Sequence, residues 1–205
     1  MSFDLTIIRH APTAYNKSNT FMGSLDISPD NISESDIEVV RRLLSQKKFV
    51  RVFSSPLRRA SITANYLFGN KYNIIFDDRL SERCLGDWQG LKKDEIKTKF
   101  PDAFKNDIMD FYYTPQNGEP FEKMIKRISS FILELSKLNE NVVVVTHNGV
   151  FRVMKSLLTG ESLSKVFFEF EPFLRPQSFY VDKKLIEIIK DNPFYTVDKN
   201  IVINQ

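Results

Sequence analysis

The segment NVVVVTH, residues 141–147, has four consecutive valines between an asparagine and a threonine. A strand that is exposed on one face alternates apolar and polar residues, whereas an unbroken β-branched run is typical of a parallel strand covered on both faces. Such a strand needs helices packed above and below its sheet. This one segment therefore predicts a layered α/β fold.

The rest of the chain supplies alternating strands and helices. Short apolar runs predict strands at 5–9, 50–55 and 72–76, and apolar spacing predicts helices at about 34–48, 56–68, 91–100, 119–138 and 149–158. Two late segments, VFFEFE at 166–171 and QSFYVDKKLIEII at 177–189, are interpreted as strands, with an antiparallel direction open for both. This order predicts a three-layer α/β/α sandwich around a mostly parallel central sheet.

Composition limits the class of protein. The 205 residues are 42% hydrophobic and contain no repeat and no low-complexity linker, so they predict a single domain over 1–205. One cysteine and two histidines offer little for a disulfide or a His/Cys zinc site, and we expect neither a metal nor a cofactor.

The N-terminus and the charge pattern indicate the compartment and the partners. The first residues lack the pattern of a signal peptide, and no apolar run approaches the roughly 20 residues of a membrane span. The net charge is only +3 and the basic pairs are dispersed, which argues against nucleic acid as the main partner. We expect a cytoplasmic protein that binds neither a membrane nor nucleic acid, with a homodimer left open.

Polar residues stand at the predicted carboxyl ends of the strands, where ligands bind in open parallel sheets. His10 follows the first strand, His147 follows the valine run, and Arg58 lies one turn into the helix after the second strand. Arg9 directly follows the buried residues LTII, so it is expected to be half-buried and to need an anion. Together these residues predict an anion-binding site along one edge of the sheet.

Four sequence blocks resemble those of the histidine phosphatase superfamily, branch 1, the phosphoglycerate mutase-like group. In chain order they are IIRHAPTAYN, VFSSPLRRASITANYL, LSERCLGDWQG and VVVVTHNGVFR. The resemblance implies a phosphoglycerate mutase-like fold and metal-independent hydrolysis of a small phosphorylated metabolite through a phosphohistidine. It extends to a phosphatase subgroup, the α-ribazole phosphate and broad-specificity sugar-phosphate phosphatases.

The resemblance also implies the role of each site residue. His10 matches the nucleophile, since a neutral imidazole attacks phosphorus without a separate base. The positions that clamp the phosphate are Arg9, Arg58 and His147. Further substrate-binding groups are Asn16 and the backbone N–H of Asn148. Glu82 matches the general acid; charge alone would not prefer it to Asp87 or Glu95.

The substrate is less constrained. Arg83 suits a carboxylate-bearing substrate, although a surface arginine explains it equally well. Residues from about 100 to 120 are expected to form part of a cap over the site. Within them Phe111, Tyr112 and Tyr113 either stack on a ligand or pack on the protein. Residues 21–26 are a second candidate wall.

Two alternatives to a phosphatase stay open: a cofactor-dependent phosphoglycerate mutase, and a non-catalytic module that binds phosphate or a phosphopeptide. Mutases of the group typically carry a longer insertion after the general acid, but here only 64 residues separate Glu82 from His147. The chain also departs from the common family pattern after the nucleophile, where Ala11 and Pro12 stand. Proline removes one backbone donor beside the pocket.

Overall fold

The structure is a computed structural model, and it describes residues 2–105, 108–169 and 171–197 of the chain. Its centre is a five-stranded sheet in the order β3-β2-β6-β1-β7. These strands are β1 (Ser2–Arg9), β2 (Arg51–Ser54), β3 (Ile74–Phe76), β6 (Val142–Thr146) and β7 (Gln177–Asp182). Four of them run parallel, and β7 pairs antiparallel with β1 at the sheet edge. A separate hairpin joins β4 (Phe104–Lys105) to β5 (Ile108–Met109).

The valine run forms the middle strand of the sheet, as its sequence predicts. Every residue of β6 is buried, because β6 lies between β1 and β2 and both faces of the sheet are covered. Strand β1 pairs with β6 in register, with Arg9 opposite Thr146. This register brings the residues that follow the two strands to the same edge of the sheet.

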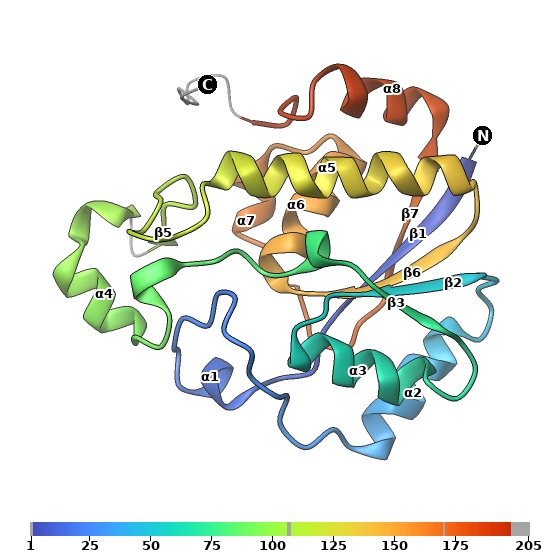
Figure 1. Cartoon of the computed structure of the whole chain (residues 1–205), viewed down its shortest axis with the longest axis horizontal. Helices are drawn as coiled ribbons and strands as arrows, with labels where there is room; N and C mark the ends of the chain where they lie inside the picture. The colour runs from blue at the N-terminus through green and yellow to red at the C-terminus, as the bar shows by residue number, and fades with distance from the viewer. Residues whose placement is uncertain (1, 106–107, 170, 198–205) are drawn as a thin grey trace.

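Helices cover both faces (Figure 1). One face carries α2 (Glu34–Leu44) and α3 (Arg58–Phe68), whose apolar residues pack on Ile8 and on Val143 and Val145. The other face carries α5 (Phe121–Leu138), α6 (Asn148–Thr159) and α8 (Lys183–Asp191). The predicted three-layer α/β/α sandwich with a mostly parallel sheet is therefore confirmed.

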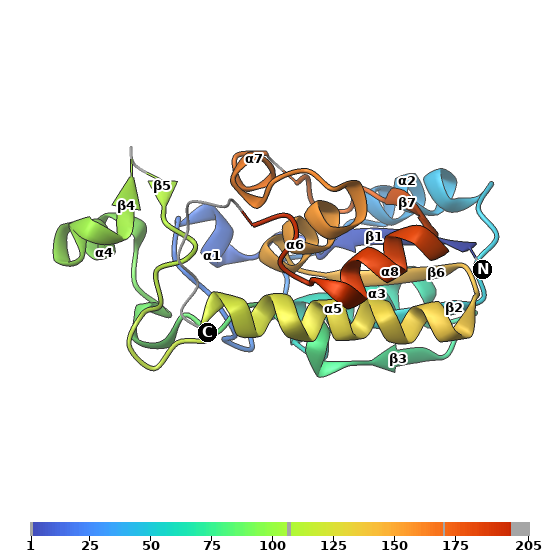
Figure 2. The ribbon, with the colours of Figure 1, turned by 90° about the horizontal axis from the view of Figure 1, so that it is seen from above.

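The shorter elements lie in the connections. They are α1 (Ala14–Lys17), α4 (Lys93–Lys99), α7 (Leu163–Phe167) and the 3₁₀ turns η1 (Asp78–Leu80), η2 (Gly86–Trp88) and η3 (Pro101–Ala103). Figure 2 shows that α4, β4 and β5 extend beyond one end of the sheet, on the side where α1 lies. Tyr113 stacks on Trp88 there, with ring centroids 5.1 Å apart.

Two sequence predictions of late strands are wrong. The segment VFFEFE begins in α7, where Ser162 caps the helix by accepting a hydrogen bond from the Lys165 N–H. Its alternating aromatic residues resemble a strand, but Leu163 and Val166 are buried at helical spacing. The segment QSFYVDKKLIEII is a strand only as far as Asp182, whose side chain caps α8 by accepting from the Leu185 N–H. Phe170 lies outside the described residues.

Within the described ranges, every helix is too short or too polar to span a bilayer. The same part of the chain contains no group of three or more histidine, cysteine, aspartate or glutamate residues that could hold a metal ion.

Candidate active site

The parallel register of β1 and β6 places the two histidines side by side. The His10 N–H donates to the carbonyl of Thr146 over 2.9 Å, which continues the β1–β6 ladder by one residue. The ring centroids of His10 and His147 are 5.2 Å apart. The Ser55 N–H donates to the carbonyl of Val145, so the end of β2 reaches the same edge. The predicted convergence of three distant segments is present in the structure.

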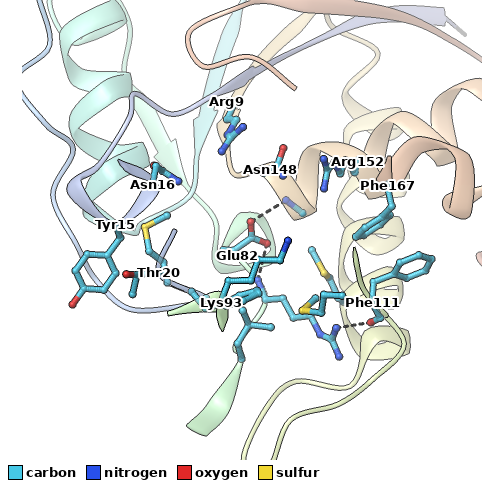
Figure 3. Close-up of a pocket in the computed structure, with 18 of the residues that line it drawn as sticks. Arg9, Tyr15, Asn16, Thr20, Glu82, Lys93, Phe111, Asn148, Arg152 and Phe167 are labelled. Atoms are coloured by element: carbon cyan, nitrogen blue, oxygen red, sulfur yellow. Dashed lines mark hydrogen bonds between the residues drawn. The ribbon is translucent and has the colours of Figure 1, made fainter. Parts of the chain in front are cut away.

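A cavity of about 450 Å³ opens at this edge (Figure 3). Six of the predicted site residues line it, namely Arg9, His10, Asn16, Glu82, Arg83 and Asn148. Two others, Arg58 and His147, are not among the lining residues. The cavity also has walls from residues 19–23 and from the segment around Phe111.

His10 is held as a neutral imidazole with a defined tautomer. Its Nδ1 lies 2.6 Å from the carbonyl oxygen of Ala11, which can only accept, so Nδ1 carries the proton and Nε2 carries the lone pair. Burial and the nearby charge of Arg59 lower the pKa of His10 to about 3. The side chain is therefore in the form that a nucleophile requires at neutral pH.

His147 is fully buried behind the cavity, and both of its ring nitrogens have protein partners. Nδ1 accepts from the Arg59 Nε–H over 3.1 Å, so Nε2 carries the proton and donates to Ser55 Oγ over 2.8 Å. Burial and Arg59 lower the pKa of His147 well below its ordinary value. This arrangement differs from the predicted phosphate clamp, because the ring supports the Arg59 guanidinium instead of pointing into the cavity.

The arginine of α3 that reaches the site is Arg59, and the expectation for Arg58 is wrong. Arg58 is exposed, and its backbone N–H donates to Asp26. Arg59 is fully buried and lines the cavity, with its guanidinium donating to the carbonyls of Leu25 and Gly23 over 2.6 and 2.7 Å. Successive helical residues differ by about 100° in direction, and Arg59 shares the inner face with Thr63.

Arg9 lies in the cavity as predicted, in a largely buried position. Its Nη1 donates to the carbonyl of Glu171 over 2.6 Å, and the guanidinium carbon lies 3.7 Å from the centre of the Phe173 ring. Burial lowers the pKa of Arg9 to about 10, so the side chain is still charged at neutral pH. Its buried Nε has no hydrogen-bond partner among the described residues, as expected of a group that binds an anion.

Glu82 is fixed where the loop after η1 meets the first turn of α6. One carboxylate oxygen accepts from its neighbour's N–H (Arg83) over 2.9 Å, and the other accepts from the Gly149 N–H over 2.9 Å. A Cβ on Gly149 would lie 2.5 Å from the carboxylate, so only glycine allows this approach. Asp87 and Glu95, the competing carboxylates, do not line the cavity.

Arg83 lies at the cavity, but its guanidinium is engaged by the protein. It donates to the carbonyls of Glu119, Phe111 and Tyr113 over 2.8, 2.5 and 2.9 Å. Burial lowers its pKa to about 10. Arg83 is therefore not a surface arginine: it holds the 111–119 segment in place, and a role toward a substrate carboxylate stays a prediction.

The aromatic residues of that segment mostly pack on the protein. Phe111 lines the cavity and stacks on Phe167 with ring centroids 4.1 Å apart. Tyr112 packs against Phe121, and Tyr113 stacks on the tryptophan of η2, so neither lines the cavity. Residues 21–23 also line the cavity, in agreement with the predicted second wall.

The two asparagines carry groups that can meet a ligand. The Asn16 side-chain oxygen accepts from the N–H and the hydroxyl of Thr13, which leaves its NH₂ group for the cavity. Asn148 is the first residue of α6, and its buried side-chain oxygen has no partner in the part of the chain that the structure describes. In Figure 3, Asn148 lies between Arg9 and a further arginine, Arg152.

Sequence reasoning missed Arg59, Arg152 and Lys93 as cavity residues. Arg152 stands on α6 one turn after Asn148, and the Lys93 side chain reaches from α4 toward Glu82 (Figure 3). The signal for Arg59 was present, since the small residues Ala60 and Ala64 mark the buried face of its helix. Lys93 has no comparable signal, because nothing in its helix indicates which charged residue turns toward the cavity.

Comparison with known proteins identifies the family. The model of the histidine phosphatase superfamily (branch 1) matches residues 5–171. Phosphoserine phosphatase 1 of Hydrogenobacter thermophilus is 30% identical over 165 residues, which are 78% of each chain. Among solved structures, Bacillus stearothermophilus YhfR has a TM-score of 0.79 at 25% identity, covering 88% of this chain and 92% of that one. The alpha-ribazole phosphatase of Shigella flexneri has a TM-score of 0.73 at 21% identity, with 89% and 92% covered. The predicted family and fold are confirmed, and the chain belongs to the histidine phosphatase superfamily, branch 1.

Proposed function

We propose that this protein hydrolyses phosphomonoesters of small metabolites through a phosphohistidine at His10. One observation carries the proposal: the Ala11 carbonyl fixes the proton on Nδ1, so His10 presents a neutral Nε2 lone pair beside two buried arginines. The family and its phosphatase relatives confirm the reaction class, phosphomonoester hydrolysis.

The first half of the reaction is transfer to the histidine. The phosphate binds between the guanidinium groups of Arg9 and Arg59, whose charged N–H groups match the non-bridging oxygens. His10 Nε2 attacks phosphorus in line, forming the N–P bond as the bond to the leaving oxygen breaks. The Glu82 carboxyl gives its proton to that oxygen, a step that contributes about 10²–10⁴-fold to the rate.

The second half returns the enzyme to its starting state. A water molecule attacks the phosphorus of the phosphohistidine, and the Glu82 carboxylate takes the proton that the water loses. The N–P bond breaks, and its electron pair returns to Nε2. Arg59 keeps its orientation throughout because His147 accepts its Nε–H, which makes His147 a positioning residue for the phosphate site.

The substrate is proposed only as a class. The Hydrogenobacter relative is named a phosphoserine phosphatase and the Shigella structure an alpha-ribazole phosphatase. A cavity of about 450 Å³ accommodates a small phosphorylated metabolite. Residues from about 100 to 120, apart from 106 and 107, which lie outside the described residues, are proposed to form part of a cap, a role supported by Met109 and Phe111 in the cavity wall.

The wider setting is proposed on the same basis. One histidine phosphatase domain spans 1–205. In support of this, all described strands lie in a single sheet except β4 and β5, which pair with each other. Dispersed charge supports a protein without a nucleic-acid partner, and the single cysteine supports a reducing compartment such as the cytoplasm. A monomer and a homodimer are both compatible with the site, because all the residues invoked above come from one chain.

The test is chemical trapping of the intermediate. The protein is mixed with p-nitrophenyl phosphate in the presence of EDTA, quenched in alkali within milliseconds and analysed by mass spectrometry. We expect one added phosphoryl group on the peptide that contains His10, and no added group and no turnover in His10→Ala. Undiminished turnover in His10→Ala would overturn the proposal, as would a phosphoryl group found on another peptide.

A further inference from the structure

Two arginines that line the cavity are held by the backbone of one short segment. Arg9 Nη1 donates to the carbonyl of Glu171 over 2.6 Å, and Arg152 Nη2 donates to the carbonyl of Glu169 over 2.5 Å. Both arginines also have a buried Nε–H without a partner among the described residues. The direction in which these guanidinium groups point therefore depends on where the segment around Glu169 and Glu171 lies.

A lysine outside the cavity fixes the side chains of the same segment. Lys155 stands on α6, and only 16% of its side chain is exposed. Its Nζ donates to the Glu169 carboxylate over 2.5 Å and to the Glu171 carboxylate over 2.8 Å. Gln177, at the start of β7, donates to the second oxygen of Glu171 over 2.7 Å. The Glu171 side chain is 1% exposed, so this buried carboxylate relies on Lys155 for its counter-charge.

Lys155 is charged under the conditions of the reaction. Burial disfavours the charged form, but the hydrogen bonds to Glu169 and Glu171 outweigh this effect and raise the pKa of Lys155. A cation that is neither in the cavity nor in contact with the substrate is thus permanently paired with two carboxylates near the cavity arginines.

Without that pairing, the carboxylates have other cations within reach. The negative charge of Glu171 acts on both Arg9 and Arg152, where it partly opposes the lowering of their pKa values by burial. A carboxylate and a phosphate compete for the same planar N–H groups of an arginine. Released from Lys155, the Glu171 carboxylate would still act on these two arginines, both of which line the cavity.

We propose that Lys155 is a positioning residue for the phosphate site: it keeps the Glu171 and Glu169 carboxylates turned away from Arg9 and Arg152, and it anchors the carbonyls that orient these two arginines. The inference rests on the proposed function in one respect, since the anion that Arg9 binds, in the cavity that Arg152 also lines, is taken to be the substrate phosphate. It adds a residue that touches neither the substrate nor the reacting atoms.

The test compares Lys155→Met with Lys155→Arg. The readouts are the Kd of inorganic phosphate by titration calorimetry, KM and kcat for p-nitrophenyl phosphate, and the Tm. In Lys155→Met we expect the phosphate Kd and the KM to rise about tenfold, the equivalent of one weakened charged hydrogen bond, with a much smaller change in kcat. Lys155→Arg, which keeps the charge, is expected to restore both values to within about threefold.

A double variant separates this role from simple destabilisation. In Lys155→Met/Glu171→Gln, the side chain at 171 has no charge to compete with phosphate, so we expect the Kd to recover toward the wild-type value. If Lys155 were only a structural residue, the Tm would fall in Lys155→Met and recover in the double variant, because contacting residues are coupled in stability as well. The phosphate Kd of the folded protein would then stay at the wild-type value in both variants. Lys165→Met, which removes an exposed pairing with Glu161, is the matched control and is expected to leave the Kd unchanged.

Two outcomes would overturn the proposal: a wild-type phosphate Kd in Lys155→Met, or a double variant that binds phosphate no better than Lys155→Met. Failure of the proposed function has a different signature. In that case the wild-type protein does not turn over p-nitrophenyl phosphate, while the comparison of phosphate Kd values still decides the role of Lys155.

Discussion

The adjacent residues Arg58 and Arg59 allow a sharply controlled test of the phosphate site. They are of the same type and neighbours on α3, but one is exposed and the other is fully buried at the cavity. The perturbation is a single substitution to glutamine at each position. Glutamine keeps a polar side chain, two bonds shorter than that of arginine, and removes the charge and the planar fork of donors.

The magnitude follows from what each side chain does. A hydrogen bond to a charged group contributes about 1.5–3 kcal/mol, and every 1.4 kcal/mol is a factor of ten. If Arg59 makes two such bonds to the transferring phosphoryl group, Arg59→Gln lowers kcat/KM by about 10²–10⁴-fold. The same change also leaves the His147 Nδ1 and the carbonyls of Gly23 and Leu25 short of a donor. Arg58→Gln is expected to stay within about threefold of wild type, as is usual for an exposed charge.

The assay is steady-state hydrolysis of p-nitrophenyl phosphate by the two variants, with urea unfolding to confirm that each is folded at the assay temperature. Arg59→Lys is included because it restores the charge without the fork, and we expect it to recover only part of the activity. Equal losses in Arg58→Gln and Arg59→Gln would refute the assignment. A larger loss in Arg58→Gln than in Arg59→Gln would show that Arg58, and not Arg59, faces the cavity.

Three further predictions concern pH, the cap and the general acid. The folded-state pKa of His10 is about 3, against 6.5 when it is unfolded, so the unfolded chain takes up the proton first and stability is lost as the pH falls below 6.5. At pH 5 the free energy of unfolding is lower by roughly 2 kcal/mol for this reason. Between pH 7.5 and 5.0, we therefore expect urea unfolding to show a decrease in this free energy that is about 2 kcal/mol smaller in His10→Asn than in wild type. Arg83→Met removes donors from three backbone carbonyls of the 111–119 segment and is expected to cost about 2–4 kcal/mol of stability by urea unfolding; a wild-type midpoint would contradict the anchoring role. Gly149→Ala places a Cβ against Glu82, so we expect roughly a 10²-fold loss on β-glycerophosphate, whose leaving oxygen needs a proton, and a much smaller loss on p-nitrophenyl phosphate; equal losses on both substrates would argue against Glu82 as the acid.

The architecture and the location of the site were predictable because both depend on long-range patterns. Four valines in a row predict a covered parallel strand, and parallel strands end at one edge of the sheet, so His10 and His147 were expected at the same edge. The direct pairing of β1 with β6, which the sequence does not show, places them side by side. The late segments were harder to interpret. Their aromatic alternation resembles a strand, but the caps at Ser162 and Asp182 depend on side-chain hydrogen bonds that start helices at those residues.

The errors within the site are local and have a common cause. Two arginines follow each other in PLRRA, and their charge and order alone do not show which of them faces the cavity. That choice can be made only together with Ala60 and Ala64, which lie on the buried side of α3. Arg83 is a second case, since its partners are carbonyl groups about thirty residues away, and no sequence pattern indicates that an arginine will bind backbone atoms.

Strand β1 pairs with β6 on one side and with β7 on the other, so the residue that follows it has a fixed backbone position. Much of the rest of the cavity wall comes from the connections between strands, from residues 20–23, from Leu85 and Lys93, and from Met109 and Phe111. The reacting group and the substrate-facing surfaces are thus carried by parts of the chain that can change independently. Engineering of the connections could redirect this protein to new phosphate esters while the chemistry at the strand end is inherited intact.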